Sequence, residues 1–310
     1  MSSLIEQAAQ RLEQLRQAGV VLPDLSDMPS AHIAARAAAP AVSVPAPAPR
    51  DEVLVTSRRV ALDLDALAAA GIVTPNAPRS HTADQYRVIK RPLIGNAMGK
   101  GAAPLKHGNL IMVTSAMAGE GKSYTSINLA MSIAAELDNT VMLVDADVAR
   151  PSVLRMLGLP ASPGLLDLLE GQTDMSDVLL KTNIDKLTIL PSGTPHARAT
   201  ELLASDAMRQ LLDDMATRYP DRIIIFDSPP LLLTTESRVL ATHMGQIVVV
   251  VQAERTLQAD VQHALSTIDS CPVRLMLLNQ ARSDSHGGYG YGYGKGYGYG
   301  YGYSSEKVGA

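Results

Sequence analysis

The sequence predicts an α/β fold in which a mainly parallel sheet is flanked by helices. Apolar runs of strand length alternate with stretches of helical periodicity, the pattern of a sheet covered on both faces. A glycine-containing loop that ends in Gly121, Lys122 and Ser123 follows the first run, and aspartates follow two later runs. Because parallel strands end at a common edge, we expect these polar groups to gather there.

The first hundred residues are predicted to precede the sheet as three segments. Residues 1–25 carry apolar side chains at helical spacing and predict an amphipathic helix, which either docks on a partner or merely caps the domain. Residues 26–52 are rich in Ala and Pro and predict a linker. Residues 53–104 predict a helical extension, in which Asp84, Arg87 and Lys90 come close at helical spacing; a solvated helix face is the simplest interpretation.

Residues 105–282 are predicted to form the main domain. Its expected strands span 110–113, 141–144, 187–190, 223–226, 247–251 and 275–278. Each is a short apolar run bounded by polar or glycine-containing segments. A helix is expected directly after the glycine-containing loop, from residue 123 to about 137.

Residues 283–310 form a tail in which glycine alternates with tyrosine. The tail is predicted to be disordered, because little apolar surface offsets the chain entropy of glycine. Its unhindered phenols suit phosphate acceptors, whereas an adhesive low-complexity tail is the alternative interpretation. The seven candidate acceptors are Tyr289, Tyr291, Tyr293, Tyr297, Tyr299, Tyr301 and Tyr303.

Composition limits the classes of partner. A net charge of -4 over 310 residues gives no support for nucleic acid as a partner. A single cysteine, Cys271, excludes an internal disulfide framework. Without an export segment or an apolar run of membrane-spanning length, we predict a cytoplasmic chain that reaches the inner face of the plasma membrane only through a partner.

The loop after the first strand predicts a nucleotide site. Backbone N–H groups beside Gly119 and Gly121 would cradle phosphates, Lys122 would supply positive charge and Ser123 a hydroxyl for Mg²⁺. A structural turn of similar sequence is the alternative. Asn279, at the end of the last strand, is a candidate for adenine recognition or simply a turn former. The predicted nucleotide-binding residues are Ala116, Met117, Ala118, Gly119, Glu120, Gly121, Lys122, Ser123, Tyr124 and Asn279.

Aspartates at two other strand ends predict phosphoryl-transfer chemistry. Asp145 and Asp147 follow one apolar run, and Asp227 follows another. In isolation Asp145 and Asp147 could be loop caps. Beside a phosphate loop, one can accept the proton of an attacking hydroxyl while others organise Mg²⁺. We assign Asp145 as the favoured base and Ser123, Asp147 and Asp227 as metal groups, although both Asp145 and Asp147 could contact the metal.

With these motifs, the chain resembles the bacterial tyrosine kinases of the polysaccharide co-polymerase type, which share ancestry with MinD- and ParA-like P-loop ATPases. The resemblance covers about residues 84–303. It implies a P-loop NTPase fold, with Lys122 and Ser123 in Walker A, Asp145 and Asp147 in Walker A′ and Asp227 in Walker B. It further implies catalysis by Lys122, Asp145 and Asp147 with ATP and Mg²⁺, and a tail cluster that becomes autophosphorylated.

The resemblance also implies partners. These are a transmembrane polysaccharide co-polymerase as activator, copies of the same chain in a ring joined through Asp84, Arg87 and Lys90, and a cognate tyrosine phosphatase. The process would be exopolysaccharide synthesis or export. More narrowly, the N-terminal helix, the Ala/Pro linker and residues 86–93 resemble kinases of exosortase-linked systems.

Two departures from the family patterns are visible. Met117 stands where MinD- and ParA-like proteins carry a signature lysine, which disfavours a non-kinase ATPase switch as the alternative function. Asp84, Arg87 and Lys90 replace the Glu-x-x-Arg-x-x-Arg pattern of the kinases while keeping its charges. A nucleotide-sensing scaffold with negligible turnover is a third possibility.

Overall fold

The structure is a computed structural model that describes residues 58–75, 80–101, 103–218 and 221–281. The predicted N-terminal helix, the Ala/Pro linker and the seven tail tyrosines lie outside these residues. Within the described part, no helix has both the length and the apolar character needed to cross a membrane.

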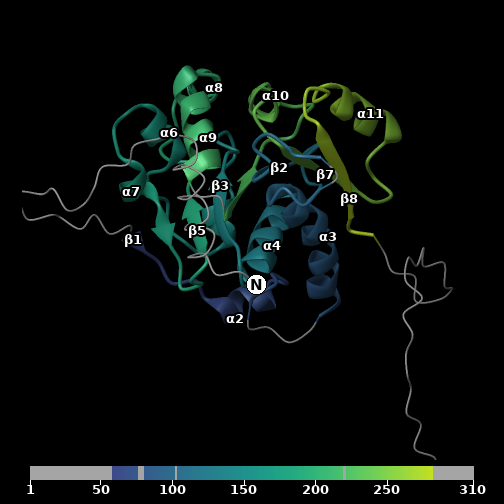
Figure 1. Cartoon of the computed structure of the whole chain (residues 1–310), viewed down its shortest axis with the longest axis horizontal. Helices are drawn as coiled ribbons and strands as arrows, with labels where there is room; N and C mark the ends of the chain where they lie inside the picture. Colours follow the sequence, from purple (N-terminus) through teal and green to yellow (C-terminus); the bar gives the residue numbers. More distant parts are fainter. Residues whose placement is uncertain (1–57, 76–79, 102, 219–220, 282–310) are drawn as a thin grey trace, which may run out of the picture. The chain divides into compact units, whose positions relative to one another are not determined.

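An eight-stranded sheet forms the centre of the described domain, in the order β1-β4-β5-β3-β6-β2-β7-β8 (Figure 1). All neighbouring pairs are parallel except β4 with β5. The strands are β1 (Arg58–Arg59), β2 (Leu110–Ser115), β3 (Thr140–Asp145), β4 (Leu180–Lys181), β5 (Leu187–Leu190), β6 (Arg222–Asp227), β7 (Gln246–Gln252) and β8 (Val273–Asn279).

Helices cover both faces of this sheet, and two apolar clusters form the core. On one face, Ile111 and Val113 of β2 join residues of the helices α2, α3, α4 and α5; on the other, Leu110 and Met112 join residues of α6 to α11. Alternate residues of β2 therefore serve opposite cores, which explains its uninterrupted apolar sequence. The helices are α2 (Leu64–Ala69), α3 (His81–Ala97), α4 (Lys122–Ala134), α5 (Val153–Met156), α6 (Leu165–Leu169), α7 (Met175–Val178), α8 (Ala199–Leu203), α9 (Asp206–Arg218), α10 (Glu236–Ala241) and α11 (Gln258–Ser266).

The predicted α/β class, all six predicted strands and the helix after the loop are confirmed. β1 and β4 were not predicted. The register places the carboxyl end of β6 between those of β3 and β2, with Asp145 opposite Asp227 and Val113 opposite Asp227. The loop and the acidic residues therefore converge, as expected, at one edge of the sheet.

The expectation of a solvated face on α3 is wrong at Lys90. Asp84 and Arg87 form an exposed ion pair of 2.5 Å, but Lys90 is only 4% exposed. Its Nζ lies 2.7 Å from Glu136 Oε1 and donates to the carbonyl oxygen of Ser132 at 2.5 Å. Packing of α3 against α4 turns Lys90 inward, and it is the acceptors at the end of α4 that make its burial tolerable.

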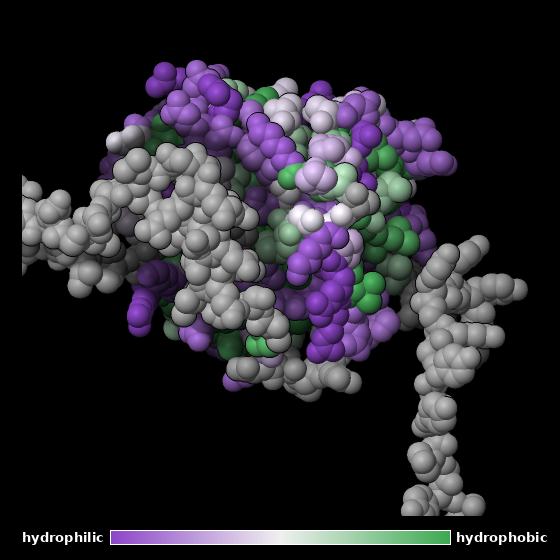
Figure 2. Space-filling model, in the orientation of Figure 1, coloured by the Kyte–Doolittle hydropathy of each residue, from purple (hydrophilic) through white to green (hydrophobic). Residues whose placement is uncertain are grey.

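The surface around α3 is mixed in character. Figure 2 shows a band of hydrophilic side chains in the region of α3, with apolar side chains beside it towards β8. Val88 of α3 is 73% exposed, and Met276 and Leu278 of the edge strand β8 are each 65% exposed.

Candidate active site

The loop between β2 and α4 has the backbone of a phosphate-binding loop. Gly119 and Gly121 adopt φ angles of 88° and 92°, which residues other than glycine rarely adopt. A Cβ on Gly121 would also come within 2.2 Å of Asn279 Nδ2. Gly121 is the N-cap of α4, so Lys122 and Ser123 open the helix that follows the loop.

This loop presents hydrogen-bond donors. In the described part of the chain, no group accepts from the N–H of Gly119, Gly121 or Lys122. Backbone N–H groups at the start of a thirteen-residue helix attract anions through their own hydrogens and through the helix dipole. The loop therefore supplies the donors that nucleotide phosphates require.

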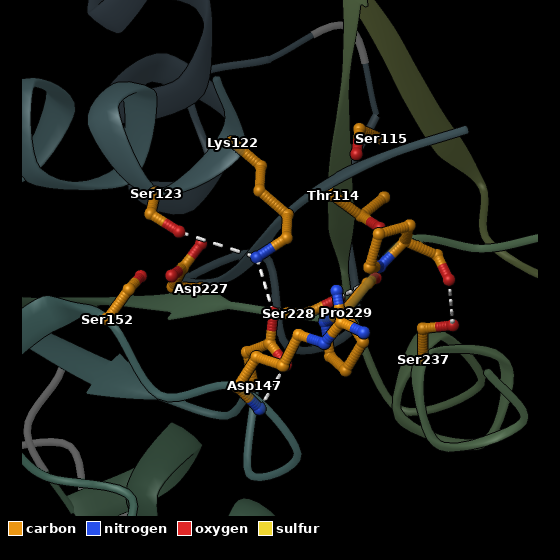
Figure 3. A network of polar contacts seen from close by, with 12 residues as sticks. Thr114, Ser115, Lys122, Ser123, Asp147, Ser152, Asp227, Ser228, Pro229 and Ser237 are labelled. Carbon is orange, nitrogen blue, oxygen red and sulfur yellow. Dashed lines mark hydrogen bonds and ion pairs between the residues drawn. The ribbon is translucent and has the colours of Figure 1, made fainter. Parts of the chain in front are cut away.

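Lys122 reaches from the loop to the second strand end. Its Nζ lies 2.5 Å from Asp147 Oδ2 and 3.4 Å from Ser123 Oγ (Figure 3). The side chains of Lys122 and Asp147 are 13% and 6% exposed. This contact brings together two of the residues predicted to act in catalysis.

Asp145 is held by the backbone that follows it. One oxygen, Oδ2, accepts from the N–H groups of Ser152 and Val153, each at 3.0 Å. The other, Oδ1, is buried without a hydrogen-bond partner. Burial, reinforced by the charge of Asp227, raises the pKa of Asp145 to about 7. A carboxylate with this pKa can take up and release a proton near neutral pH.

Asp227, at the end of β6, lies beside Asp145, at the end of β3, and Asp227 is fully buried. Its Oδ1 accepts from Ser126 Oγ at 3.1 Å, while Oδ2 has no partner. Burial raises the pKa of Asp227, and the charge of Lys122 opposes that rise. Figure 3 shows Asp227 close to Lys122 and Ser123.

The residues at this edge fit Mg²⁺. One carboxylate oxygen, Oδ2 of Asp227, is buried without a partner at the end of β6, and Mg²⁺ binds through one or two carboxylates together with substrate phosphates. Within the described ranges, no three His, Cys, Asp or Glu side chains form a ready metal cluster. Phosphate oxygens, water and the Ser123 hydroxyl would complete the coordination.

A cavity of about 370 Å³ opens beside Lys122 and Asp147. Arg150, which the sequence analysis did not assign, also lines it; the signal was its position three residues after Asp147. Two larger cavities, of about 620 and 640 Å³, lie elsewhere, and neither is lined by Lys122 or Asp147. We therefore take the smaller cavity as the functional one. Its lining residues are Ala118, Gly119, Lys122, Asp147, Ala149, Arg150, Pro229, Pro230, Leu233 and Thr234.

The other predicted nucleotide-binding residues occupy varied positions. Ala116 is buried and Met117 is 39% exposed. The hydroxyl of Tyr124 donates to the carbonyl oxygen of Gly71 at 2.5 Å, so it joins α4 to the segment after α2. Glu120 turns inward, and Asn279 Nδ2 donates to the Glu120 carbonyl oxygen at 2.9 Å. Glu120 and Asn279 thus brace the loop, a role the sequence analysis missed.

Comparison with known proteins identifies relatives of this domain. The family model described as an AAA domain matches residues 108–279. The tyrosine-protein kinase CpsD of Streptococcus agalactiae is 30% identical over 190 residues, covering 59% of this chain and 81% of that protein. The tyrosine-protein kinase ptk of Acinetobacter johnsonii is 33% identical over 181 residues, or 58% of this chain. The chain covers only 24% of the length of ptk.

A solved structure shares the architecture. The crystal structure of the chimerical protein CapA2B2 superposes with a TM-score of 0.55 at 25% identity, covering 69% of this chain and 97% of the other. The similarity therefore extends over nearly all of that protein.

Proposed function

Because the chain belongs to the family of bacterial tyrosine kinases that includes CpsD, we propose that it is an ATP- and Mg²⁺-dependent protein-tyrosine autokinase. The observation that carries this proposal is the convergence of three groups at one sheet edge: a phosphate loop, a lysine paired to Asp147, and two buried aspartates with open oxygens. The acceptors are the seven tail tyrosines, Tyr289 to Tyr303.

In the proposed reaction, a tyrosine oxygen forms a bond to the γ-phosphorus of ATP as the bridging bond to the β-phosphate breaks. Asp145 takes the phenol proton, because its open Oδ1 and its pKa of about 7 suit a general base. Lys122 stabilises negative charge on the phosphate oxygens. Asp147, Asp227 and Ser123 would hold Mg²⁺, which supplies further positive charge to those oxygens.

Asp147 has a second task in this arrangement. Its contact with Lys122 at 2.5 Å holds the ammonium group over the cavity. The N–H of Arg150 donates to Asp147 Oδ1 at 3.2 Å, which fixes the carboxylate from behind. Lys122 is therefore oriented before a nucleotide arrives, so less side-chain entropy is lost on binding.

Partners belong to the same proposal. Similarity to the CapA2B2 chimera supports a membrane activator of the CapA type, which would recruit the chain to the inner face of the plasma membrane. We further propose a ring of copies joined through the region of Asp84 and Arg87, a cognate phosphatase, and a role in exopolysaccharide synthesis. The link to exosortase systems rests on the sequence of residues 1–52 and 86–93 alone.

The test is incubation with γ-labelled ATP and Mg²⁺, with and without cytoplasmic tails of candidate co-polymerases, followed by mass-spectrometric mapping of the tail. We expect phosphate on residues 289–303 and its loss in Lys122→Met. Lys90→Met is the matched control, because it removes a buried lysine remote from the cavity. Release of phosphate with an unmodified tail would instead establish an ATPase switch, and negligible turnover a nucleotide-sensing scaffold.

A further inference from the structure

Glu120 puts a negative charge inside a loop that should attract anions. A carboxylate pointing towards bound phosphates would repel them. Glu120 is only 2% exposed, and its side chain instead turns into the protein. Its two neighbours, Gly119 and Gly121, both have positive φ angles, so the backbone is sharply folded around it. The position of this side chain calls for a role other than phosphate contact.

Three groups from different parts of the chain bind Glu120. Its Oε2 accepts from the N–H of Met117 at 2.7 Å, within the loop itself. Its Oε1 accepts from the hydroxyl of Thr256, which follows β7. Its backbone carbonyl accepts from Asn279 Nδ2 at 2.9 Å, at the end of β8. Hydrogen bonds to both the side chain and the backbone carbonyl of Glu120 therefore hold the loop in place at this one residue.

These fastening points belong to a larger link between strand ends. The N–H of Ala253 donates to the carbonyl oxygen of Asn279 at 2.9 Å. Gln252 Nε2 donates to Gln280 Oε1 at 2.6 Å, so the residue after β8 is tied to the end of β7. The chain leaves the described domain at residue 281, directly beyond this link. A shift of the phosphate loop would thus displace the last described residues, 279–281, which precede the tyrosine tail.

We propose that Glu120 is a positioning residue. Together with Met117, Thr256 and Asn279 it forms a latch that joins the phosphate loop to residues 279–281, the last described residues before the tyrosine tail. The latch keeps the Glu120 charge away from the phosphates and holds the loop in its nucleotide-binding shape. Coupling between two sites is reciprocal, so a nucleotide that stabilises the end of β8 through the latch is itself bound more tightly when that end is ordered. Nucleotide binding and the structural ordering of the carboxyl end of β8 therefore increase together. This inference rests on the nucleotide binding of the proposed function, but it does not require transfer to tyrosine.

The first test measures the dissociation constant of Mg²⁺·ADP for the full chain by calorimetry. Thr256→Val keeps the shape of the side chain but removes the hydroxyl, and we expect binding to weaken about tenfold, the value of a hydrogen bond to a charged group. Thr256→Ser should restore wild-type affinity. Thr242→Val is the matched control, since that hydroxyl only donates to the carbonyl oxygen of Val239 within its own helix.

Thr256→Val also removes a second contact, because the Thr256 hydroxyl accepts from the N–H of Gln252 at 3.2 Å. Glu120→Gln leaves that contact in place and tests the Glu120 carboxylate alone. An amide has one acceptor oxygen for the two donors, so we again expect about tenfold weaker binding. Combining Glu120→Gln with Thr256→Val should cost much less than the product of the two single losses, because both remove the same bond. Independent, multiplicative losses would contradict a shared latch.

The second test follows hydrogen exchange of residues 273–281 with and without saturating Mg²⁺·ADP. We expect ADP to slow exchange there in the wild type and to have little effect in Asn279→Ala. Three results would overturn the latch. The first is wild-type ADP affinity in both Thr256→Val and Glu120→Gln, and the second is equally weak ADP binding by Thr256→Ser and Thr256→Val. The third is a wild-type hydrogen-exchange rate that ADP does not change. Failure of the wild type to bind ADP would instead overturn the proposed function.

Discussion

Two lysines of this domain, the buried Lys90 and the partly buried Lys122, have different surroundings. Lys90 is surrounded by acceptors: Glu136 at 2.7 Å and the carbonyl oxygen of Ser132 at 2.5 Å. Burial raises the pKa of Glu136, but the hydrogen bond and charge of Lys90, helped by Arg91, outweigh this and lower it. The Lys90 cluster is thus electrostatically complete. We expect it to serve packing of α3 on α4.

The second lysine, Lys122, belongs to an unfinished cluster. It contacts Asp147 at 2.5 Å, but the neighbouring Asp145 and Asp227 each bury one carboxylate oxygen without a partner. Burial raises the pKa of both aspartates, which shows that the fold stabilises their ionised forms poorly. The difference between the two lysines teaches where a ligand belongs: at the polar cluster that the protein leaves incomplete.

The sharpest separation of the two sites is the pair Lys122→Met and Lys90→Met. We expect Lys122→Met to lower tyrosine phosphorylation about a thousandfold or more, because the lost charge faces the transferred phosphate. Its thermal stability should fall less than that of Lys90→Met, since Asp147 lines a cavity from which water can hydrate its carboxylate. Initial rates with labelled ATP and the melting temperature of each variant provide the measurement.

Lys90→Met should show the reverse pattern. Removing the ammonium leaves Glu136 partly buried beside the exposed Arg91, and we expect a loss of about 2–3 kcal/mol in the free energy of unfolding. Nucleotide affinity of the folded fraction should remain that of the wild type. Urea unfolding and nucleotide titration at low temperature test both parts. An undiminished stability would mean that the Lys90 cluster is not structural.

The same contrast explains what the sequence could predict. Strands such as β2 and β6 are continuous apolar runs buried on both faces, and their ends carry the loop and Asp227, so strand position and site could be read together. β1 and β4 have two residues each, too few for periodicity, and depend on pairing between distant segments. Local pattern alone cannot reveal such strands.

Side-chain direction was equally beyond the sequence. Spacing along α3 brings Lys90 near Arg87, but only the packing of α4 decides that Lys90 is buried while Arg87 stays exposed. Glu120 fits a variable position of the phosphate-loop pattern, and its partners Thr256 and Asn279 lie more than a hundred residues away. These contacts join distant elements, which a motif does not describe.

The pH dependence of stability should expose the unfinished cluster. Asp145 ionises near pH 4 in the unfolded chain but near 7 when folded, so the folded state holds an extra proton between these values. Its contribution therefore lowers stability by about 3–4 kcal/mol as pH rises from 4 to 7. Asp145→Asn should remove that part of the profile in urea unfolding at pH 5 and pH 8. Identical profiles for the variant and the wild type would contradict the raised pKa.

The smallest expected effect concerns the third charged pair, Asp84 with Arg87. Both side chains are about half exposed, so water screens their attraction, and Arg87→Ala should change the free energy of unfolding by less than about 0.5 kcal/mol. An exposed pair that contributes so little to the fold is available to a neighbour, as the proposed ring requires. We therefore expect Arg87→Ala to lower the oligomer mass measured by light scattering while the melting temperature stays constant. A loss of stability without a change in mass would assign this pair to the fold, alongside Lys90.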